Sequence, residues 1–196
     1  MRTRIFTYLL AASVSFVQPA AAETKMSASD EPFSLSSAIE TLGRNIKETW
    51  SAPQNRDLYL PLYTWHNRLT YDQEKIDKYN ENPWGFGYGV SRYDRDGDWH
   101  GLYAMAFKDS NDYMQTIFGY VYQKMWNLDD AENWHAGAGF TLSLTQRHEY
   151  YYIPVPLPLP VAGLTYKDFS LQAAYVPGVK NDGNVLFTWL RWKIDR

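Results

Sequence analysis

The 196 residues include no cysteine, which excludes both a disulfide-stabilised scaffold and a lipoprotein anchored through an N-terminal cysteine. The sequence also lacks an apolar run of the ~20 residues that a membrane-spanning helix needs. Positive charge is not in excess, since 19 Lys and Arg stand against 22 Asp and Glu. This balance argues against a nucleic-acid partner. No set of side chains has the spacing of metal ligands, so neither a metal nor another cofactor is expected.

The N-terminus has the features of a secretory signal peptide. Arg2 and Arg4 form a positive region, a mostly apolar stretch follows, and Ala20–Ala22 provide a small-residue cleavage site. We therefore expect a signal peptide over residues 1–22 and a flexible polar segment over 23–35. The remaining length corresponds to one domain.

Aromatic residues are abundant: 16 Tyr, 8 Trp and 9 Phe make up 17% of the chain. A densely packed soluble β-protein is one explanation. An outer-membrane barrel is the other, because Trp and Tyr gather in girdles at both membrane interfaces of such proteins. An exported chain without an apolar helix can still span a membrane as a closed barrel.

An amphipathic helix is expected over residues 36–51. Ser37 and Glu40 form a capping box at its start. Apolar residues then recur at helical spacing, at Ile39, Leu42, Ile46 and Trp50. Such a helix could pack on a globular core, or it could lie in the membrane interface at one end of a barrel.

Eight strand-like runs follow the helix. They are Leu58–Tyr71, Trp84–Tyr93, Trp99–Lys108, Gln115–Trp126, Trp134–Arg147, Tyr150–Ile153 with its continuation to about Leu164, Phe169–Val176 and Val185–Trp192. Tight hairpin signals and longer charged loops alternate between them. Their lengths approach the ~9–11 residues that cross a membrane. The fold class predicted is therefore an all-β, eight-stranded antiparallel transmembrane β-barrel over residues 57–196, preceded by the amphipathic helix.

The run Gly101–Ser110 is apolar on both faces and ends in a charged, hydroxyl-bearing corner. A strand of this kind fits a barrel wall with lipid outside and something apolar inside. Prolines lie in or beside strands at Pro61, Pro83, Pro160 and Pro177. Each proline removes a donor of the strand ladder, so the barrel could open sideways and admit an acyl chain from the membrane.

Several sequence blocks resemble one known family, the outer-membrane lipid A palmitoyltransferases (PagP). The blocks are DLYLP at 57–61, TWH at 64–66, YDQEK at 71–75, YNENPWG at 79–85, DWHGLYAMAFKDS at 98–110, YYIPVPLPLP at 151–160, YVPG at 175–178 and NDGNV at 181–185. The resemblance implies an eight-stranded barrel whose helix clamps its periplasmic end. It also implies an enzyme that moves a palmitoyl chain from the sn-1 position of a phospholipid to a hydroxyacyl chain of lipid A.

The family's functional residues correspond to His66, Asp109 and Ser110. Imidazole is a natural base for acyl transfer near neutral pH, and it could activate either the Ser110 hydroxyl or the acceptor hydroxyl. Ser110 is then a nucleophile or an oxyanion donor. Asp109 either orients His66 or holds its loop. Since adjacent residues diverge on a strand, one of Asp109 and Ser110 must have loop geometry.

The resemblance also places Pro61 and Pro83 at one lateral opening, and Pro160 and Pro177 at the other. Val121 stands where the family has a glycine at the floor of the acyl pocket. A packed lumen has no spare volume for extra methylenes, so we expect Val121 to shorten the acyl chain that is accepted.

The expected partners are a phospholipid donor and a lipid A acceptor, for a membrane-embedded monomer or weak homodimer in the outer membrane of a Gram-negative bacterium. Basic residues expected on outer loops are candidates for binding lipid A phosphates, with a solvated surface as the alternative: Arg68, Lys75, Lys78 and Arg92. The alternative function is a non-catalytic outer-membrane or lipid-binding β-barrel, which would need neither His66 nor Ser110.

Overall fold

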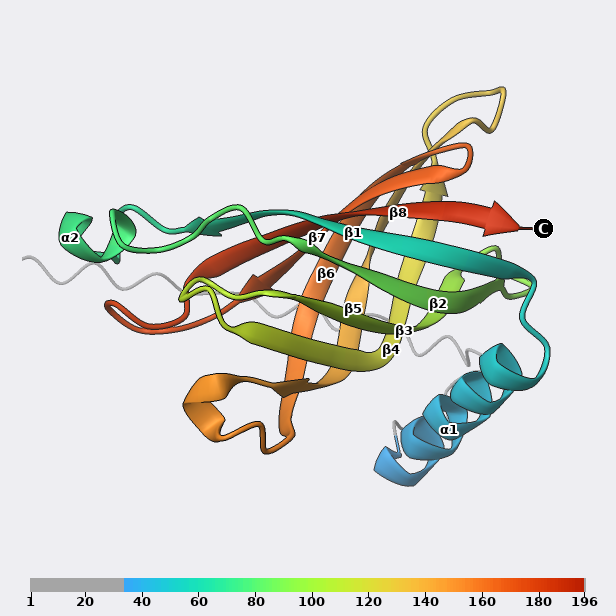
Figure 1. Ribbon diagram of the computed structural model, residues 1–196. Helices are drawn as coiled ribbons and strands as arrows, with labels where there is room; N and C mark the ends of the chain where they lie inside the picture. Colours follow the sequence, from blue (N-terminus) through green and yellow to red (C-terminus); the bar gives the residue numbers. More distant parts are fainter. Residues whose placement is uncertain (1–33, 196) are drawn as a thin grey trace, which may run out of the picture. The chain divides into compact units, whose positions relative to one another are not determined.

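Eight antiparallel strands close into a barrel in the order β1 to β8, and β8 pairs with β1 (Figure 1). The computed structural model describes residues 34–195; the expected signal peptide over 1–22 and almost all of the flexible segment over 23–35 lie outside the described residues. The elements are α1 (Leu35–Ser51), β1 (Asn55–His66), α2 (Gln73–Ile76), β2 (Gly85–Tyr93), β3 (Trp99–Lys108), β4 (Met114–Asn127), β5 (Trp134–Gln146), η1 (His148–Tyr150), β6 (Val155–Tyr166), β7 (Phe169–Val176) and β8 (Val185–Asp195). The predicted barrel with a preceding helix is confirmed.

Two predicted strands were wrong at their ends. The first ends at His66 instead of Tyr71, because the amides of Thr70 and Tyr71 turn back to the Asn67 carbonyl. The run at 150–153 is a turn that precedes β6. Tyr151 and Tyr152 have φ angles of 52° and 59°, which lie in the left-handed region and not in the extended region of a strand.

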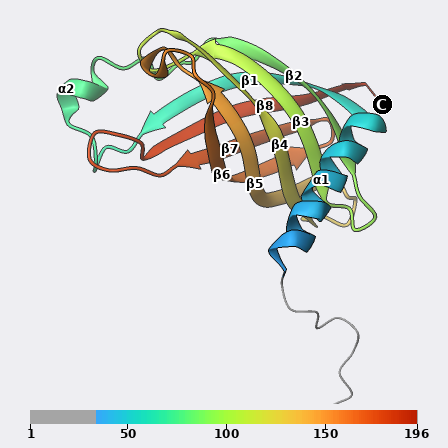
Figure 2. The same cartoon turned by 90° about the horizontal axis from the view of Figure 1, so that it is seen from below.

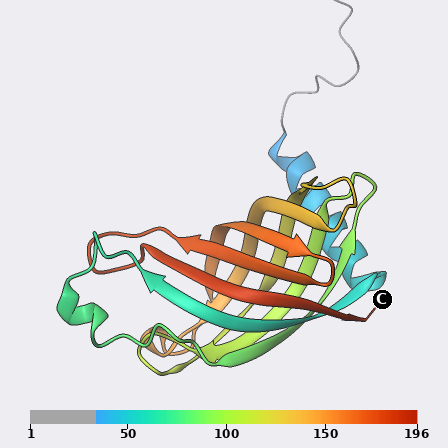
Figure 3. The ribbon, with the colours of Figure 1, turned by 90° about the horizontal axis from the view of Figure 1, so that it is seen from above.

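The two ends of the barrel differ in their connections (Figure 3). At the end where β1 begins, the connections are short, at residues 94–98, 128–133 and 167–168. The opposite end, called the rim below, has longer connections, above all residues 67–84 with the short helix α2. This difference is typical of outer-membrane barrels.

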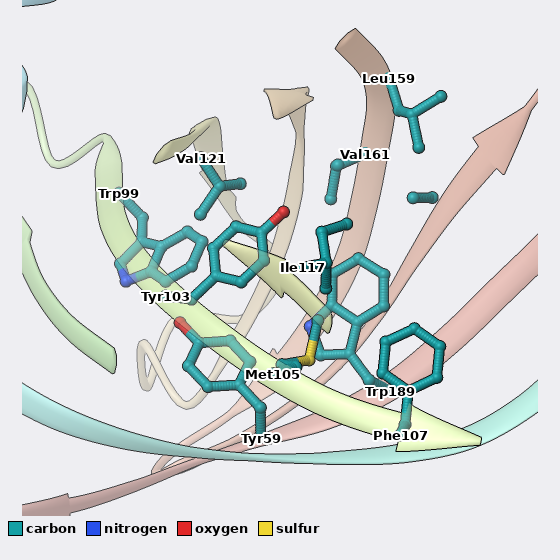
Figure 4. Close-up of a cluster of buried hydrophobic side chains, with 11 residues drawn as sticks. Tyr59, Trp99, Tyr103, Met105, Phe107, Ile117, Val121, Leu159, Val161 and Trp189 are labelled. Atoms are coloured by element: carbon teal, nitrogen blue, oxygen red, sulfur yellow. The ribbon is translucent and has the colours of Figure 1, made fainter. Parts of the chain in front are cut away.

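The side chains of β3 alternate between the lumen and the outer surface, as a strand requires. Tyr103, Met105 and Phe107 are buried in the lumen, whereas Leu102 and Ala104 face outward. Figure 4 shows Tyr103, Met105 and Phe107 with the other buried apolar side chains of the lumen.

The lumen near α1 is filled by polar side chains. Arg191 lies 3.5 Å from Asp57, donates to Ser170 at 2.7 Å and stacks over the Trp99 ring at 4.3 Å. A second chain of hydrogen bonds runs from Trp189 to Gln172 and on to Gln123. Buried charges and amides are tolerated when they are paired. Together these side chains fill the part of the lumen near α1, called the lower lumen below.

Helix α1 contacts β2 and β3 on the outside of the barrel (Figure 2). Arg92 of β2 binds Glu48 at 2.9 Å and Asn45 at 3.0 Å, so its expected place on an outer loop was wrong. The helix begins at Leu35, which puts Ser37 inside the first turn instead of at the cap. Within the described residues, none of the helices has the length and apolar character needed to span a membrane.

Candidate active site

His66, the last residue of β1, lies at the rim with 2% of its surface exposed. Its Nε2 atom is 3.1 Å from the Ser110 hydroxyl oxygen. Its Nδ1 atom is 3.0 Å from Oε1 of Glu81. Each ring nitrogen therefore has one partner, a hydroxyl on one side and a carboxylate on the other.

Glu81 comes from the long connection between β1 and β2. Both of its carboxylate oxygens bind the Arg68 guanidinium at 2.6 Å, and the Tyr63 hydroxyl donates to Oε2 at 2.7 Å. The hydrogen bonds from Arg68 hold the pKa of the Glu81 carboxyl well below its usual range. The carboxylate is therefore ionised at neutral pH.

Two tyrosine rings pack on His66. The Tyr79 ring lies at a centroid distance of 4.7 Å and the Tyr71 ring at 5.1 Å, edge-on. The Tyr71 hydroxyl donates to the Gly183 carbonyl at 2.7 Å. Burial raises the pKa of Tyr71 to about 12, so this hydroxyl stays protonated near neutral pH. The two rings help to shield the imidazole from water.

The loop after β3 carries Asp109 and Ser110, and it resolves the geometric conflict between these neighbours. Oδ1 of Asp109 accepts hydrogen bonds from the amides of Asn111 and Tyr113 at 2.8 and 3.0 Å, and Oδ2 lies 3.8 Å from Arg147. Within residues 34–195, no hydrogen bond joins Asp109 to His66. Of the two roles expected for Asp109, these contacts correspond to holding the loop that presents Ser110.

A cavity of about 350 Å³ runs from the rim into the lumen. His66, Asp109 and Ser110 are at its mouth, and apolar side chains such as Phe107 and Leu159 line its walls. The cavity therefore connects a polar site with an apolar tube, which suits a molecule with a polar head and a hydrocarbon tail.

The cavity ends above Val121. Its deepest lining residues along their strands are Tyr103, Thr141 and Trp189. Val121 of β4 pairs with Gly101 of β3, closer to the α1 end of the barrel than Tyr103 of the same strand. Val121 is 3% exposed and lies beside Trp99 and Tyr103 (Figure 4). Its isopropyl group thus fills space directly beneath the cavity.

The strand ladder is interrupted at two places near the rim. Pairing between β1 and β2 stops at Tyr59 with Gly87, although β1 continues to His66. Pairing between β6 and β7 stops at Val161 with Ala174, although β6 begins at Val155. Pro61 and Pro83 lie beside the first interruption, and Pro160 and Pro177 lie beside the second.

Glu81 is the site residue that the sequence did not single out. It stands in the block YNENPWG, but nothing in that block indicates that its carboxylate reaches β1. The only sequence signal was an acidic residue in a long rim loop, a feature that several other loops share. Among residues 34–195, no group of three or more His, Asp or Glu side chains is arranged to hold a metal ion.

A family model described as antimicrobial peptide resistance and lipid A acylation protein PagP matches residues 45–191. The chain belongs to the PagP family. A protein of Pectobacterium atrosepticum named lipid A acyltransferase PagP is 50% identical over 182 residues, which cover 93% of this chain and 83% of the relative. Proteins with the same name are 60% identical over 151 residues in Proteus mirabilis (76% of this chain, 71% of the relative) and 58% identical over 158 residues in Photorhabdus laumondii (81% and 76%). Membership of this family and the closed barrel fit a place in the outer membrane.

Proposed function

We propose that this barrel is an outer-membrane lipid A acyltransferase that moves an acyl chain from the sn-1 position of a glycerophospholipid to a hydroxyacyl chain of lipid A. The observation that carries the proposal is the 3.1 Å contact between His66 and Ser110 at the mouth of an apolar cavity. The names of the relatives supply the acceptor, lipid A.

The arrangement favours Ser110 as the group that His66 deprotonates. Nε2 of His66 takes the hydroxyl proton while Oγ of Ser110 attacks the sn-1 ester carbonyl. The bond to the glycerol oxygen breaks, and that oxygen leaves with the proton held by His66. In the second half, His66 takes the proton of the lipid A hydroxyl while that oxygen attacks the acyl-serine carbonyl. The ester bond to Oγ then breaks, and His66 returns the proton to Oγ of Ser110. Asp109 supports this step by holding the loop of Ser110.

Lipids would enter and leave the cavity through the two interruptions of the ladder. Unpaired backbone groups are costly where they face lipid. Proline has no N–H to leave unpaired, so a strand interruption beside proline is suited to a passage through the barrel wall. Pro61 and Pro83 would border one passage, and Pro160 and Pro177 the other. At the blind end of the cavity, Val121 would make the enzyme prefer an acyl chain shorter than palmitate.

The proposed setting is the outer membrane of a Gram-negative bacterium, reached through a cleaved signal peptide over residues 1–22. The α1 end would face the periplasm, and the rim with His66 would face the outer leaflet. A closed barrel has no free sheet edge to pair with a second copy, so we propose that the enzyme acts as a monomer or at most a weak homodimer.

Mass spectrometry of lipid A from an outer membrane that contains this protein tests the proposal. Chelator treatment before extraction brings phospholipid into the outer leaflet. We expect one added acyl chain with the unaltered protein and with His135→Ala, a control at the α1 end. His66→Ala and Ser110→Ala should add none, although both fold as judged by heat-modifiable migration in gels. Folded, unaltered protein that adds no acyl chain would instead support a non-catalytic barrel.

A further inference from the structure

We propose that Glu81 is the positioning residue of the active site, which fixes the proton of His66 on Nδ1 and stabilises the imidazolium that forms during acyl transfer. This inference rests on the proposed function. It gives the orienting role to a rim-loop glutamate instead of Asp109, the carboxylate next to Ser110 in the sequence.

One carboxylate oxygen holds His66 at two points. Oε1 of Glu81 accepts from the backbone amide of His66 at 3.1 Å and lies 3.0 Å from its Nδ1 atom. Two contacts to one atom fix the ring relative to its own backbone, so the χ angles of His66 have little freedom. An ionised carboxylate can only accept a hydrogen bond, and Nδ1 must therefore carry the proton. The lone pair of Nε2 then points at the Ser110 hydroxyl.

Hydrogen bonds hold both the carboxylate and the backbone of Glu81 in place. Arg68 binds both of its oxygens, Tyr63 donates to Oε2, and the Glu81 carbonyl accepts from the Thr64 amide at 2.9 Å. Its side chain is only 13% exposed. A carboxylate that is already paired and desolvated needs no rearrangement when positive charge develops on His66, which is the basis of electrostatic preorganisation.

The other groups around His66 cannot take this role. Arg147 is cationic and opposes an imidazolium. Tyr71 and Tyr79 present their rings, and Ser110 occupies the opposite nitrogen. Asp109 is turned to its own loop. Glu81 is thus the anion in hydrogen-bond contact with the imidazole among the described residues.

The protons balance without protonation of Glu81. The hydroxyl proton of Ser110 passes to Nε2, and the ring becomes a cation with both nitrogens protonated. The same proton then passes from Nε2 to the departing glycerol oxygen. Throughout, Nδ1 keeps its proton and Glu81 keeps its charge, as in serine–histidine–carboxylate triads generally.

Transfer kinetics of Glu81→Gln, with phosphatidylethanolamine labelled in its sn-1 chain and purified lipid A in detergent micelles, test this inference. Gln has nearly the same size and lacks the charge. We expect kcat to fall by roughly 10²–10³-fold, which is part of the roughly 10²–10⁴-fold that a positioned general base contributes, with KM nearly unchanged. The acidic limb of the pH–rate profile should move to lower pH, because an imidazole without its anionic partner binds a proton less readily. Glu81→Asp should regain part of the rate.

Tyr63→Phe is the matched control, since it removes one other hydrogen bond of Glu81, at Oε2, and leaves the contact of Oε1 with His66. It should keep at least a tenth of the rate and the original acidic limb. If it loses as much activity as Glu81→Gln, or if Glu81→Gln leaves the pH profile in place, Glu81 only holds the loop and the inference fails. Unaltered protein that is as inactive as His66→Ala would instead refute the proposed function.

Nitrogen NMR of histidine-labelled, otherwise unaltered protein gives a second test that needs no variant of Glu81 to fold. The His66 signals are assigned by their loss in His66→Ala. We expect the neutral form to carry its proton on Nδ1. A neutral form with the proton on Nε2 would overturn the inference.

Discussion

The side chains that form the active site at the rim come from segments far apart in the sequence. His66 ends β1, Ser110 follows β3, and Glu81 lies between them in a loop. The Asn80 amide donates to the Ser110 carbonyl at 2.9 Å, which ties the Glu81 loop to the Ser110 loop. Because this hydrogen bond links the two loops, we expect a change in either loop to disturb the contact between His66 and Ser110.

At the residue scale, Val121 gives a graded prediction. Val121→Ala and Val121→Gly remove volume beneath the cavity, where Val121 packs against Gly101 and Trp99. We expect the preferred donor chain to lengthen in the order unaltered, Ala, Gly. The lost burial should cost about 1.5–3 kcal/mol of stability. Transfer from phospholipids with sn-1 chains of increasing length, measured one at a time and in competition, checks this order.

An equal chain-length preference in all three proteins would show that the isopropyl group does not set the limit. Phe118→Leu is a suitable control, because Phe118 lies on the same strand with its side chain outside the lumen. It should leave the chain-length preference unchanged.

At the scale of elements, local sequence patterns predicted most of the barrel. The apolar residues on both faces of β3 could be read from the sequence alone. The predicted bounds of β7, Phe169 and Val176, are also correct. Both strands end where the local sequence favours a turn. The end of β1 and the start of β6 were missed because local turns replace the strand there, at Asn67–Tyr71 and at Tyr151–Tyr152, without a Gly or Pro to mark them in the sequence. Glu81 was missed for a different reason, since its partner His66 lies 15 residues away across a loop.

The interrupted ladder between β1 and β2 supports a cross-linking prediction. Leu60 and Phe86 would form the next pair after Tyr59 and Gly87, and both face outward. The chain has no cysteine, so Leu60→Cys with Phe86→Cys introduces one defined disulfide. We expect oxidation to lower transfer at least tenfold and reduction to restore it, because the bond closes the passage.

The matched control is Ala104→Cys with Phe118→Cys, a pair in the continuous ladder of β3 and β4. Oxidation there should leave the transfer rate unchanged. Full activity of the oxidised Leu60 and Phe86 variant, with the disulfide confirmed by mass, would rule out this passage as a required route.

At the scale of the whole molecule, exposed aromatic side chains gather toward both ends of the barrel. Those at the α1 end include Trp126, Trp134, Tyr166, Phe169 and Trp192, and those at the rim include Trp84, Phe86, Tyr113, Tyr150 and Tyr152. Such girdles lie at the two surfaces of a membrane, with an apolar band between them.

The membrane placement predicts a dependence of stability on depth. Leu142 faces outward near the middle of β5, between Tyr120 and Pro158 on the neighbouring strands. Leu142→Arg should lower the free energy of unfolding by about 2–4 kcal/mol, whereas Tyr166→Arg at the α1 end should cost about 0–1 kcal/mol. Reversible unfolding by denaturant in lipid vesicles measures both. Equal costs would contradict the proposed placement.

The polar layer of Arg191, Asp57 and Gln172 in the lower lumen has a consequence for the cell that carries the protein. A barrel with a cavity open at one end would leak ions and small solutes if the cavity continued to the other end. Here the paired charges and amides fill that path, so the cavity is blind. We therefore expect the barrel to pass neither ions nor small solutes, even when the cavity is empty between two rounds of reaction.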